Sequence, residues 1–179
     1  MEGTTDIKLF ILTGPESTGK TMLAEELTLQ YNAAYFPEYA REYISGLNRR
    51  YNFEDVIHIA KVQAGQMKEF IGSGGNIGFF DTYLVITKIW LEIVYNRVPD
   101  WIDREIGLTK GALYLLCRPD IPWEPNPLRE NGGEMRNILF RKYEEELKRH
   151  ELNYCYIEGF GEQRLRCARD YINNYFTGK

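Results

Sequence analysis

The 179-residue chain has few of the residues that build disulfide frameworks or metal clusters. Its three cysteines, Cys117, Cys155 and Cys167, are an odd number and lack the spacing of metal ligands. Its two histidines, His58 and His150, lie far apart in the sequence. These features argue against a secreted disulfide scaffold and against a zinc site, and they favour reduced thiols in a cytoplasmic protein.

The sequence also lacks long hydrophobic runs and an excess of positive charge. No apolar stretch approaches the ~20 residues that span a bilayer. No basic segment precedes the first apolar run, so a secretory signal is not expected either. Lysine and arginine number 22 against 26 aspartates and glutamates, which gives a formal net charge of −4. This balance argues against non-specific binding to nucleic acid or to an anionic membrane surface.

The remaining composition, 44% hydrophobic and 27% charged, is typical of a globular domain. Short apolar runs alternate with longer amphipathic stretches. We expect strands at residues 9–12, 33–36, 77–80, 113–117 and 154–157, and helices over residues 19–31 and 54–71 and after the last two strands. The pattern predicts one α/β domain over residues 1–179, with a core of about 7–176 and a mainly parallel sheet covered by helices on both faces.

A proline-rich segment interrupts this alternation. Four of the seven prolines lie within nine residues, at Pro119, Pro122, Pro125 and Pro127. Proline removes amide donors and disfavours helix in the residue before it, so the segment is predicted to be a stiff loop. A long loop in a compact domain is often functional, and we expect a lid over about residues 118–136. A plain surface loop is the alternative.

Residues 14–21, Gly-Pro-Glu-Ser-Thr-Gly-Lys-Thr, match the phosphate-loop pattern G-x-x-x-x-G-K-[ST] in full. An apolar run precedes them and a helix-forming run follows. Glycines let backbone amides turn towards phosphate oxygens, and the following helix presents its positive end to them. Lys20 is expected to reach the β- and γ-phosphates and Thr21 to bind Mg²⁺. The predicted ATP-binding residues are Gly14, Glu16, Ser17, Thr18, Gly19, Lys20 and Thr21.

Asp81 ends the third expected strand, where a phosphate-loop protein needs a second acidic group for Mg²⁺ or its water. We expect this role, with capping of the next helix as the alternative. The chain has no N-K-x-D base-reading element, and Asp81 is followed by Thr-Tyr-Leu in place of a D-x-x-G switch. A guanine-nucleotide switch is therefore not expected. A motor or oligomeric ATPase usually needs a longer chain, so a small-molecule kinase with a cationic lid is favoured.

Arginines flank the proline-rich segment at positions 118, 129, 136 and 141. Helical spacing puts Arg136 on the face of Tyr143 and Leu147, towards the protein body, and puts Arg141 towards solvent. We therefore expect Arg129 and Arg136 to be catalytic residues that stabilise phosphate charge. An ordinary surface ion pair is the alternative for each.

The acceptor is expected at the carboxyl end of the second strand. Glu38 there could accept a hydroxyl proton or hold a ribose diol, and Arg41 could bind phosphate or fix Glu38. A solvated helix start is the alternative, and the catalytic base stays open between Asp81 and Glu38. Gln63 lies in an apolar helix stripe, so its amide must pair, with the backbone or with a substrate amide or base.

Tryptophans at positions 90 and 101 are expected in the core, but Trp123 lies in the predicted lid. A ring there could stack on a flat ligand, and a cationic ligand would also suit the neighbouring Asp120. Packing of Trp123 against the domain is the alternative. The expected substrate-binding residues are Glu38, Arg41, Gln63, Asp120 and Trp123.

The motifs G-P-E-S-T-G-K-T, P-E-Y-A-R-E-Y, F-F-D-T, T-K-I-W and P-D-I-P-W with L-R-E occur in this order. Over residues 8–175 the sequence resembles the NadR-type ribosylnicotinamide kinase domain of the P-loop NTPase superfamily. The resemblance implies a five-stranded parallel core and ATP- and Mg²⁺-dependent phosphorylation of nicotinamide riboside to nicotinamide mononucleotide in NAD salvage. The residues that match the family's motifs are Lys20, Thr21, Glu38, Arg41, Asp81, Trp123 and Arg129.

Two positions depart from the family pattern. Tyr83 stands where members often have a second acid after the third strand, and residues 125–129 replace a D-D-G-x-R run. These acids would suit a cationic pyridinium riboside. Two alternatives therefore stay open, a kinase of another nucleoside or nucleotide and a non-catalytic ATP-binding sensor of pyridine nucleotides. The oligomeric state also stays open.

Overall fold

A computed structural model describes residues 7–125 and 130–178. Its parallel sheet has the spatial order β2-β3-β1-β4-β5. The strands are β1 (Lys8–Thr13), β2 (Ala34–Phe36), β3 (Ile77–Asp81), β4 (Leu113–Cys117) and β5 (Asn153–Ile157). The helices of the described residues are α1 (Lys20–Tyr31), α2 (Tyr39–Ser45), α3 (Phe53–Gly72), α4 (Leu84–Tyr95), α5 (Asp100–Gly107), α6 (Met135–Arg149) and α7 (Glu162–Thr177).

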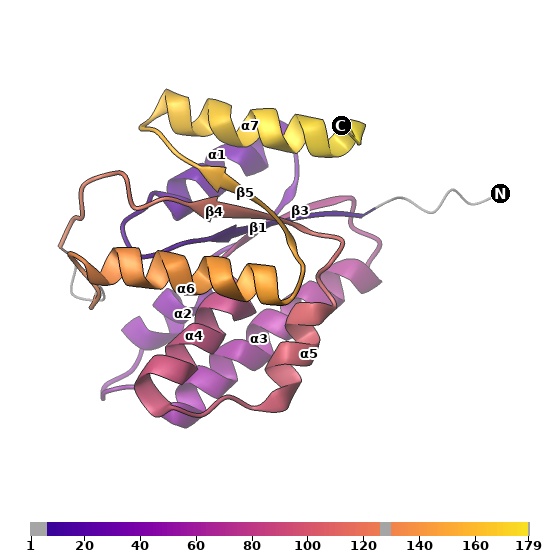
Figure 1. Cartoon of the computed structure of the whole chain (residues 1–179). Helices are drawn as coiled ribbons and strands as arrows, with labels where there is room; N and C mark the ends of the chain where they lie inside the picture. The colour runs from indigo at the N-terminus through magenta and orange to yellow at the C-terminus, as the bar shows by residue number, and fades with distance from the viewer. Residues whose placement is uncertain (1–6, 126–129, 179) are drawn as a thin grey trace.

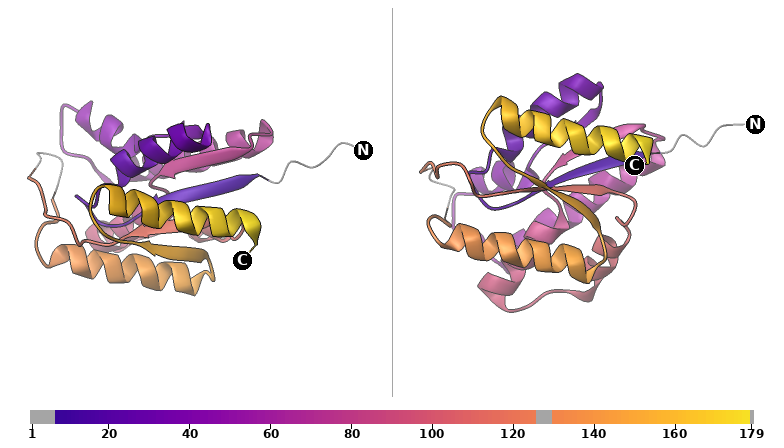
Figure 2. Two further views of the ribbon diagram at one scale, coloured as in Figure 1. Left: turned by 90° about the horizontal axis from the view of Figure 1, so that it is seen from above. Right: turned by 45° about the horizontal axis from the view of Figure 1, so that its top comes forward.

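Helices cover both faces of the sheet (Figures 1 and 2), with α1 and α7 on one face and α3 to α6 on the other. The alternation of side chains along β1 explains this arrangement, since successive residues of a strand point to opposite faces. Phe10 and Leu12 pack into the cluster with α1 and α7. Leu9 and Ile11 pack into the cluster with α3 to α6. A strand buried on both faces therefore reads as a continuous apolar run.

The predicted five-stranded sheet is confirmed, and all of its strand pairs are parallel. Each observed strand differs from its predicted range by one residue at most at either end. Helix α5 was not predicted, and the start of α2 was considered only as the alternative explanation of the charges at Glu38 and Arg41. Helices α2 and α5 have only seven and eight residues, and α2 has no fully buried residue, so neither carries a hydrophobic stripe long enough to recognise in the sequence.

The register of the sheet brings the predicted site together. Leu12 of β1 pairs with Asp81 of β3, so the phosphate loop and Asp81 lie at the same edge. β1 lies between β3 and β4, and the chain leaves β1 for α1 and then β2 on the side of β3. Ligands of open α/β sheets bind at this carboxyl edge, where neighbouring crossovers diverge.

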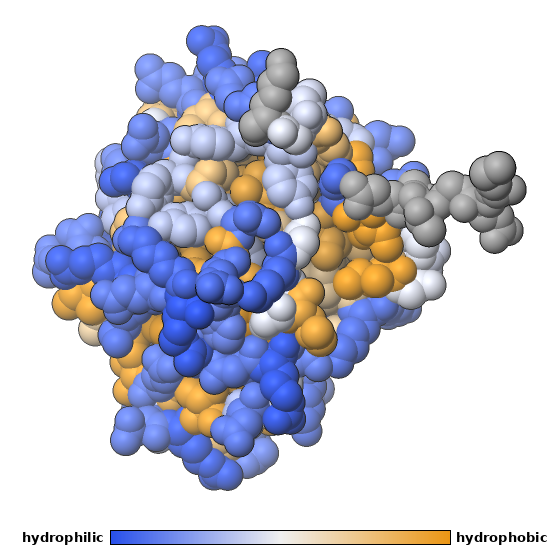
Figure 3. All heavy atoms as spheres, turned by 45° about the vertical axis from the view of Figure 1, so that its right-hand side comes forward, coloured by the Kyte–Doolittle hydropathy of each residue, from blue (hydrophilic) through white to orange (hydrophobic). Residues whose placement is uncertain are grey.

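Between β4 and α6 the described residues 118–125 and 130–134 form no helix or strand, so the predicted loop is confirmed there. A lid motion of this loop stays a prediction. No helix in the described part of the chain combines the length and the hydrophobicity that crossing a membrane requires. The face drawn in Figure 3 is largely hydrophilic, with hydrophobic residues visible between the polar ones.

Candidate active site

The phosphate loop joins β1 to α1 through a backbone that needs glycine. Gly14 has a φ of 145° and Gly19 a φ of 74°, both in the region that side chains rarely adopt. A Cβ atom on Gly14 would also lie 2.6 Å from the carbonyl oxygen of Cys117. Ser17 adopts a positive φ of 57° without being glycine. Such backbone strain is concentrated at functional sites.

Side chains of the loop brace its backbone. The Lys20 ammonium donates hydrogen bonds to the carbonyl oxygens of Gly14 (2.9 Å) and Pro15 (2.8 Å). The Thr18 hydroxyl donates to the same Pro15 oxygen at 2.9 Å. Among the described residues, no side chain caps the start of α1. The first turn of this helix therefore offers backbone N–H groups and the positive end of its dipole to an anion.

Thr21 and Asp81 meet at the metal side of the predicted site. The Thr21 hydroxyl donates to Asp81 Oδ2 at 2.6 Å, and Asp81 is only 1% exposed. Its other oxygen, Oδ1, is buried and has no hydrogen-bond partner within residues 7–125 and 130–178. Burial raises the pKa of Asp81, opposed by the charge of Lys20 and the Thr21 hydrogen bond. A buried carboxylate oxygen beside a hydroxyl fits Mg²⁺, which prefers oxygen ligands.

The alternative role of Asp81 as a helix cap is wrong. Helix α4 begins at Leu84, its N-cap residue is Tyr83, and no side chain in the described part of the chain makes a capping hydrogen bond there. Thr82, between the strand and this cap, has a φ of 74°. Two residues, Thr82 and the N-cap residue Tyr83, thus separate Asp81 from the first residue of α4.

A cavity of about 580 Å³ opens beside the phosphate loop. Its volume suits a small metabolite. It brings together the predicted residues Gly14, Glu16, Ser17, Lys20, Glu38, Arg41 and Gln63. These residues come from the phosphate loop, the chain before and within α2, and the middle of α3. The cavity therefore joins the predicted ATP site to most of the predicted acceptor site.

Glu38 and Arg41 form an ion pair, with 2.7 Å between Arg41 Nη2 and Glu38 Oε2. Of the two roles considered for Arg41, this contact is the one that fixes Glu38. The Glu38 side chain is 25% exposed and lines the cavity, so its carboxylate can reach a ligand there.

Gln63 lies in the wall of the cavity and is 4% exposed. Its Oε1 accepts a hydrogen bond from the Thr87 hydroxyl of α4 at 2.7 Å. The expected backbone pairing is thus replaced by a side-chain partner that sequence reasoning missed. No hydrogen bond in the described part of the chain uses the Gln63 amide nitrogen, which leaves two donors for a ligand.

An aromatic pair that the sequence did not single out forms another part of the cavity wall. The rings of Tyr51 and Trp90 lie 4.9 Å apart at 78°, and Trp90 Nε1 donates to the Tyr51 hydroxyl at 3.3 Å. Trp90 was expected in the core, and it packs partly against the core while lining the cavity. In the sequence, Trp90 could have been recognised as a site residue from its place in the T-K-I-W motif.

The predicted orientations of two arginines are confirmed. Arg136 is 7% exposed and donates hydrogen bonds to the carbonyl oxygens of Ser17 (2.9 Å) and Ile121 (3.0 Å). The Arg141 side chain is 64% exposed. The Arg136 side chain thus contacts a backbone carbonyl oxygen of the phosphate loop. Its catalytic role in stabilising phosphate charge stays a prediction. Arg129 lies outside the described residues.

Two predicted substrate residues do not line the cavity. Asp120 accepts hydrogen bonds from Arg164 Nη1 and from the Gly159 amide, both at 2.8 Å. Its carboxylate therefore ties the segment after β4 to the loop after β5. Trp123 packs on Gly132, where an added Cβ would lie 3.3 Å from the indole. This packing is the alternative that was considered for Trp123.

Tyr83, which replaces a frequent second acid of the resembled family, is 2% exposed within the hydrophobic core. Its ring lies 6.4 Å from that of Phe80. An ionised carboxylate in this apolar setting would be costly, so this chain uses the position for packing.

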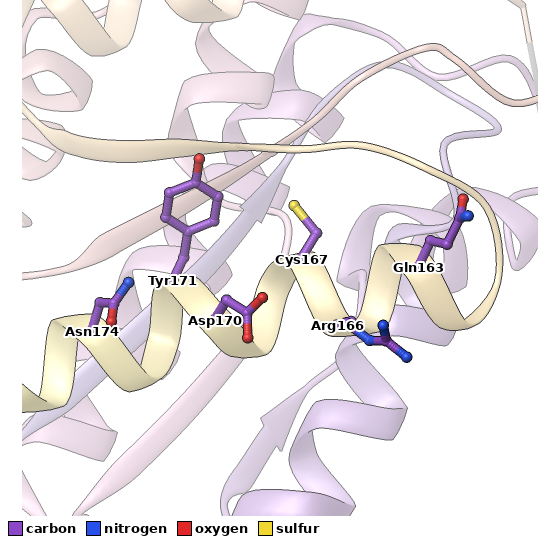
Figure 4. Close-up of a pocket in the computed structure, with 6 residues that line it drawn as sticks. All are labelled: Gln163, Arg166, Cys167, Asp170, Tyr171 and Asn174. Atoms are coloured by element: carbon purple, nitrogen blue, oxygen red, sulfur yellow. The ribbon is translucent and has the colours of Figure 1, made fainter.

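A second hollow, shown in Figure 4, is lined by Gln163, Arg166, Cys167, Asp170, Tyr171 and Asn174 of α7 and includes none of the predicted site residues.

Sequence relatives are found among NAD biosynthesis proteins. The chain is 23% identical over 169 residues to the trifunctional NAD biosynthesis/regulator protein NadR of Salmonella typhimurium. It is 25% identical over 173 residues to the protein of that name from Escherichia coli. Each match covers 90% of this chain and 41% of the relative, so the chain spans about two-fifths of the length of these relatives.

Solved structures share the fold. A NadR structure in complex with NR has a TM-score of 0.74 and 21% identity, and the match covers 97% of this chain and 52% of that one. A deoxyadenosine kinase from M. mycoides has a TM-score of 0.61 and 16% identity, with 93% and 98% covered. The resemblance to NadR that the motifs indicated is therefore confirmed. Residues 9–164 match the family described as an AAA domain, and since this match spans most of the chain, the protein belongs to that family.

Proposed function

We propose that the protein is an ATP- and Mg²⁺-dependent kinase that phosphorylates nicotinamide riboside at its 5′-hydroxyl, giving nicotinamide mononucleotide. One observation carries the proposal. A single cavity joins the phosphate loop to a carboxylate, a buried amide and an aromatic pair. The likeness to NadR, whose name includes NAD biosynthesis and whose structure was determined with NR, supports this acceptor.

The nucleotide half of the reaction rests on the phosphate loop. Backbone amides of residues 14–19 and the start of α1 would hold the β- and γ-phosphates, with the Lys20 ammonium on the transferred group. Thr21 and Asp81 would hold Mg²⁺, which would neutralise part of the negative charge of the phosphate groups. The unpartnered Asp81 Oδ1 supports this assignment.

In the acceptor half of the reaction, we assign Glu38 as the base that takes the proton of the attacking hydroxyl. Glu38 lines the cavity, whereas Asp81 does not line it and is already bonded to Thr21. Glu38 would therefore take the proton of the attacking hydroxyl, and its ion pair with Arg41 would hold the carboxylate in position. Phosphoryl transfer depends mainly on positioning and charge stabilisation, so a fixed carboxylate is well suited to this role.

The flat end of the acceptor matches the other walls. A pyridinium ring would lie against Tyr51 and Trp90, since aromatic faces attract cations. The free N–H groups of Gln63 would donate to the carboxamide oxygen. Burial of the ring and amide would account for selectivity, because a site built for hydrogen bonding rejects an analogue that lacks the group.

The experiment measures ATP consumption with Mg²⁺ and nicotinamide riboside, against a panel of other nucleosides and nucleoside monophosphates. We expect turnover with nicotinamide riboside, and a loss of about a hundredfold or more in Lys20→Ala. Lys61→Ala, an exposed change on α3, is the matched control and should keep full activity. Turnover only with another nucleoside would identify that nucleoside as the acceptor in place of nicotinamide riboside. ATP binding without turnover would favour a non-catalytic sensor.

A second candidate, a nucleoside monophosphate kinase, is favoured by one observation. Arg50 is exposed and lines the same cavity, where it would suit an anionic acceptor. Its neighbour Arg49 is committed to Asp55 through two hydrogen bonds of 2.6 and 2.8 Å. Arg50→Ala separates the two candidates. It should leave turnover of nicotinamide riboside within about twofold, and it should impair turnover of a monophosphate by about tenfold.

A further inference from the structure

Glu16, the third residue of the phosphate loop, directs its carboxylate to a different segment of the chain. Oε1 accepts hydrogen bonds from the Glu130 amide and the Asn131 side chain, both at 3.3 Å, and Oε2 accepts from the Asn131 amide at 3.0 Å. Both oxygens are thus engaged. A carboxylate aimed at a polyphosphate would repel it, so these contacts give Glu16 a use that phosphate binding does not.

The hydrogen bonds continue from this segment to the aromatic pair. The Tyr51 hydroxyl donates to Glu130 Oε2 at 3.0 Å and accepts from Trp90 Nε1 at 3.3 Å. All five residues, Glu16, Tyr51, Trp90, Glu130 and Asn131, line the same cavity. We call this chain of contacts the Glu16 network. It runs from the phosphate loop to the rings proposed to hold the acceptor.

We propose that Glu16 is a positioning residue that sets the aromatic end of the acceptor cavity through residues 130 and 131. The inference rests on the proposed function and adds a specificity device to it. Ordering Tyr51 and Trp90 before the acceptor arrives lowers the entropy lost on binding. Burial raises the pKa of Tyr51, and the hydrogen bond to Glu130 raises it further, whereas the Trp90 hydrogen bond lowers it by less. The Tyr51 hydroxyl therefore stays protonated and can donate a hydrogen bond.

A direct test needs no substrate. In Glu16→Ala, the backbone amides of Glu130 and Asn131 lose their acceptor, so their hydrogen exchange should accelerate by about tenfold or more in the ligand-free protein. Glu26→Ala on the exposed side of α1 is the matched control and should leave these rates unchanged. Unchanged exchange of both amides in Glu16→Ala would overturn the proposal.

Kinetics separate positioning from nucleotide binding. Glu16→Ala should raise the KM for nicotinamide riboside by about tenfold and leave the KM for ATP within about twofold. Glu16→Gln, which keeps one acceptor oxygen, should fall between the alanine variant and the wild type. A change confined to the KM for ATP would instead make Glu16 a nucleotide contact and would defeat the proposal.

The coupling is measured with Tyr51→Phe, which keeps the ring and removes the hydroxyl. If Glu16 acts through Tyr51, the double variant should raise the KM for the acceptor by less than the product of the two single effects. Fully multiplicative effects would contradict the network. If the wild-type protein turns over no riboside, the proposed function fails, and the exchange rates of Glu130 and Asn131 still decide whether Glu16 positions this segment.

Discussion

Asp81 shows how one buried group combines a cost in stability with a use in chemistry. Its carboxyl is 1% exposed, one oxygen accepts from Thr21, and the other lacks a partner among the described residues. Burial raises its pKa, which means that folding disfavours the ionised form. Lys20 opposes this shift. A divalent cation at the free oxygen would stabilise the ionised form further, so the unfavourable burial is consistent with metal binding.

Replacement of Asp81 by asparagine tests this role. The asparagine side chain would keep the shape and the hydrogen bond to Thr21 but would lose the charge, so Mg²⁺-dependent turnover should fall by about a hundredfold or more. A carboxyl with a raised pKa in the folded state adds stability at low pH and loses it as pH rises through that pKa. At pH 7 Asp81→Asn should therefore be at least as stable as the wild type in thermal unfolding.

The control for this variant is Asp170→Asn, an exposed change on α7 that should alter neither activity nor stability. Activity of Asp81→Asn within about threefold of the wild type would show that Asp81 is not a metal ligand.

Gln63 illustrates a different limit of prediction. The sequence indicated that its amide needed a partner, but the partner Thr87 lies on another helix and could not be read from the stripe of α3.

The helices α4, α5 and α6 are joined by a partly buried network of charges. Lys88 of α4 is 3% exposed and contacts Glu146 of α6 and Asp103 of α5, the latter at 3.0 Å. Arg149 and His150 contact the same two carboxylates. Oxygen and nitrogen atoms of Asp103, Glu146 and His150 lie within 4.8 Å of one another. Lys88 and Arg149 pair with these acids, so ion pairs between helices account for the cluster without a metal ion.

Removal of the lysine should be costly. Lys88→Met leaves Glu146 buried with less compensation, and we expect a loss of about 2–4 kcal/mol in the free energy of unfolding, measured with urea. Lys68→Met, at an exposed pair with Glu105, is the control and should cost about 0.5 kcal/mol or less. Equal effects of the two variants would show that the partly buried network contributes nothing beyond a surface pair.

The same network should respond to acid. Burial acts to raise the pKa of Asp103 and of Glu146, but hydrogen bonds and charges from Lys88 and Arg149 outweigh it and lower both. A lowered pKa adds stability above the ordinary values of 3.8 and 4.5 and loses it as pH falls through the folded-state values. The difference in the free energy of unfolding between the wild type and Lys88→Met should therefore become smaller as the pH is lowered from 7 to below these ordinary values. A constant difference would contradict this cause.

The elements of the sheet were easier to predict than the short helices. Each strand is a compact apolar run, and the long helix α3 carries a stripe that includes Val56, Ile59 and Met67. A capping box at Asn52 and Asp55 marks its start. Helices α2 and α5 are too short to show such a stripe, and their packing on α3 and α4 stabilises them.

Across the whole molecule, Arg136 links parts of the chain that are far apart in sequence. Its guanidinium bonds the carbonyl oxygens of Ser17 in the phosphate loop and Ile121 after β4. Helix α6, which carries it, also supplies Leu139 and Tyr143 to the cavity wall. A displacement of α6 would therefore change the phosphate loop and the cavity together.

Arg136→Ala should lower kcat by about tenfold or more and destabilise the fold by about 1–3 kcal/mol, because two partly buried hydrogen bonds to carbonyl oxygens lose their charged donor. Arg141→Ala removes an exposed arginine from the same helix and should change neither quantity. Arg136→Lys should recover part of the stability but not all of the rate, since lysine cannot hold both oxygens in the same fork. An unchanged kcat in Arg136→Ala would exclude the catalytic role.

The phosphate loop, the strands and the acid after β3 were readable from the chain alone. Each depends on neighbours in sequence: a glycine at a strained turn, an apolar run, or a carboxylate at a strand end. The aromatic part of the cavity wall was not, because Tyr51 reaches Trp90 across 39 positions and Glu130 across 79. Such contacts arise when parallel crossovers bring distant loops to one edge of the sheet, and no local pattern records which side chains will meet there.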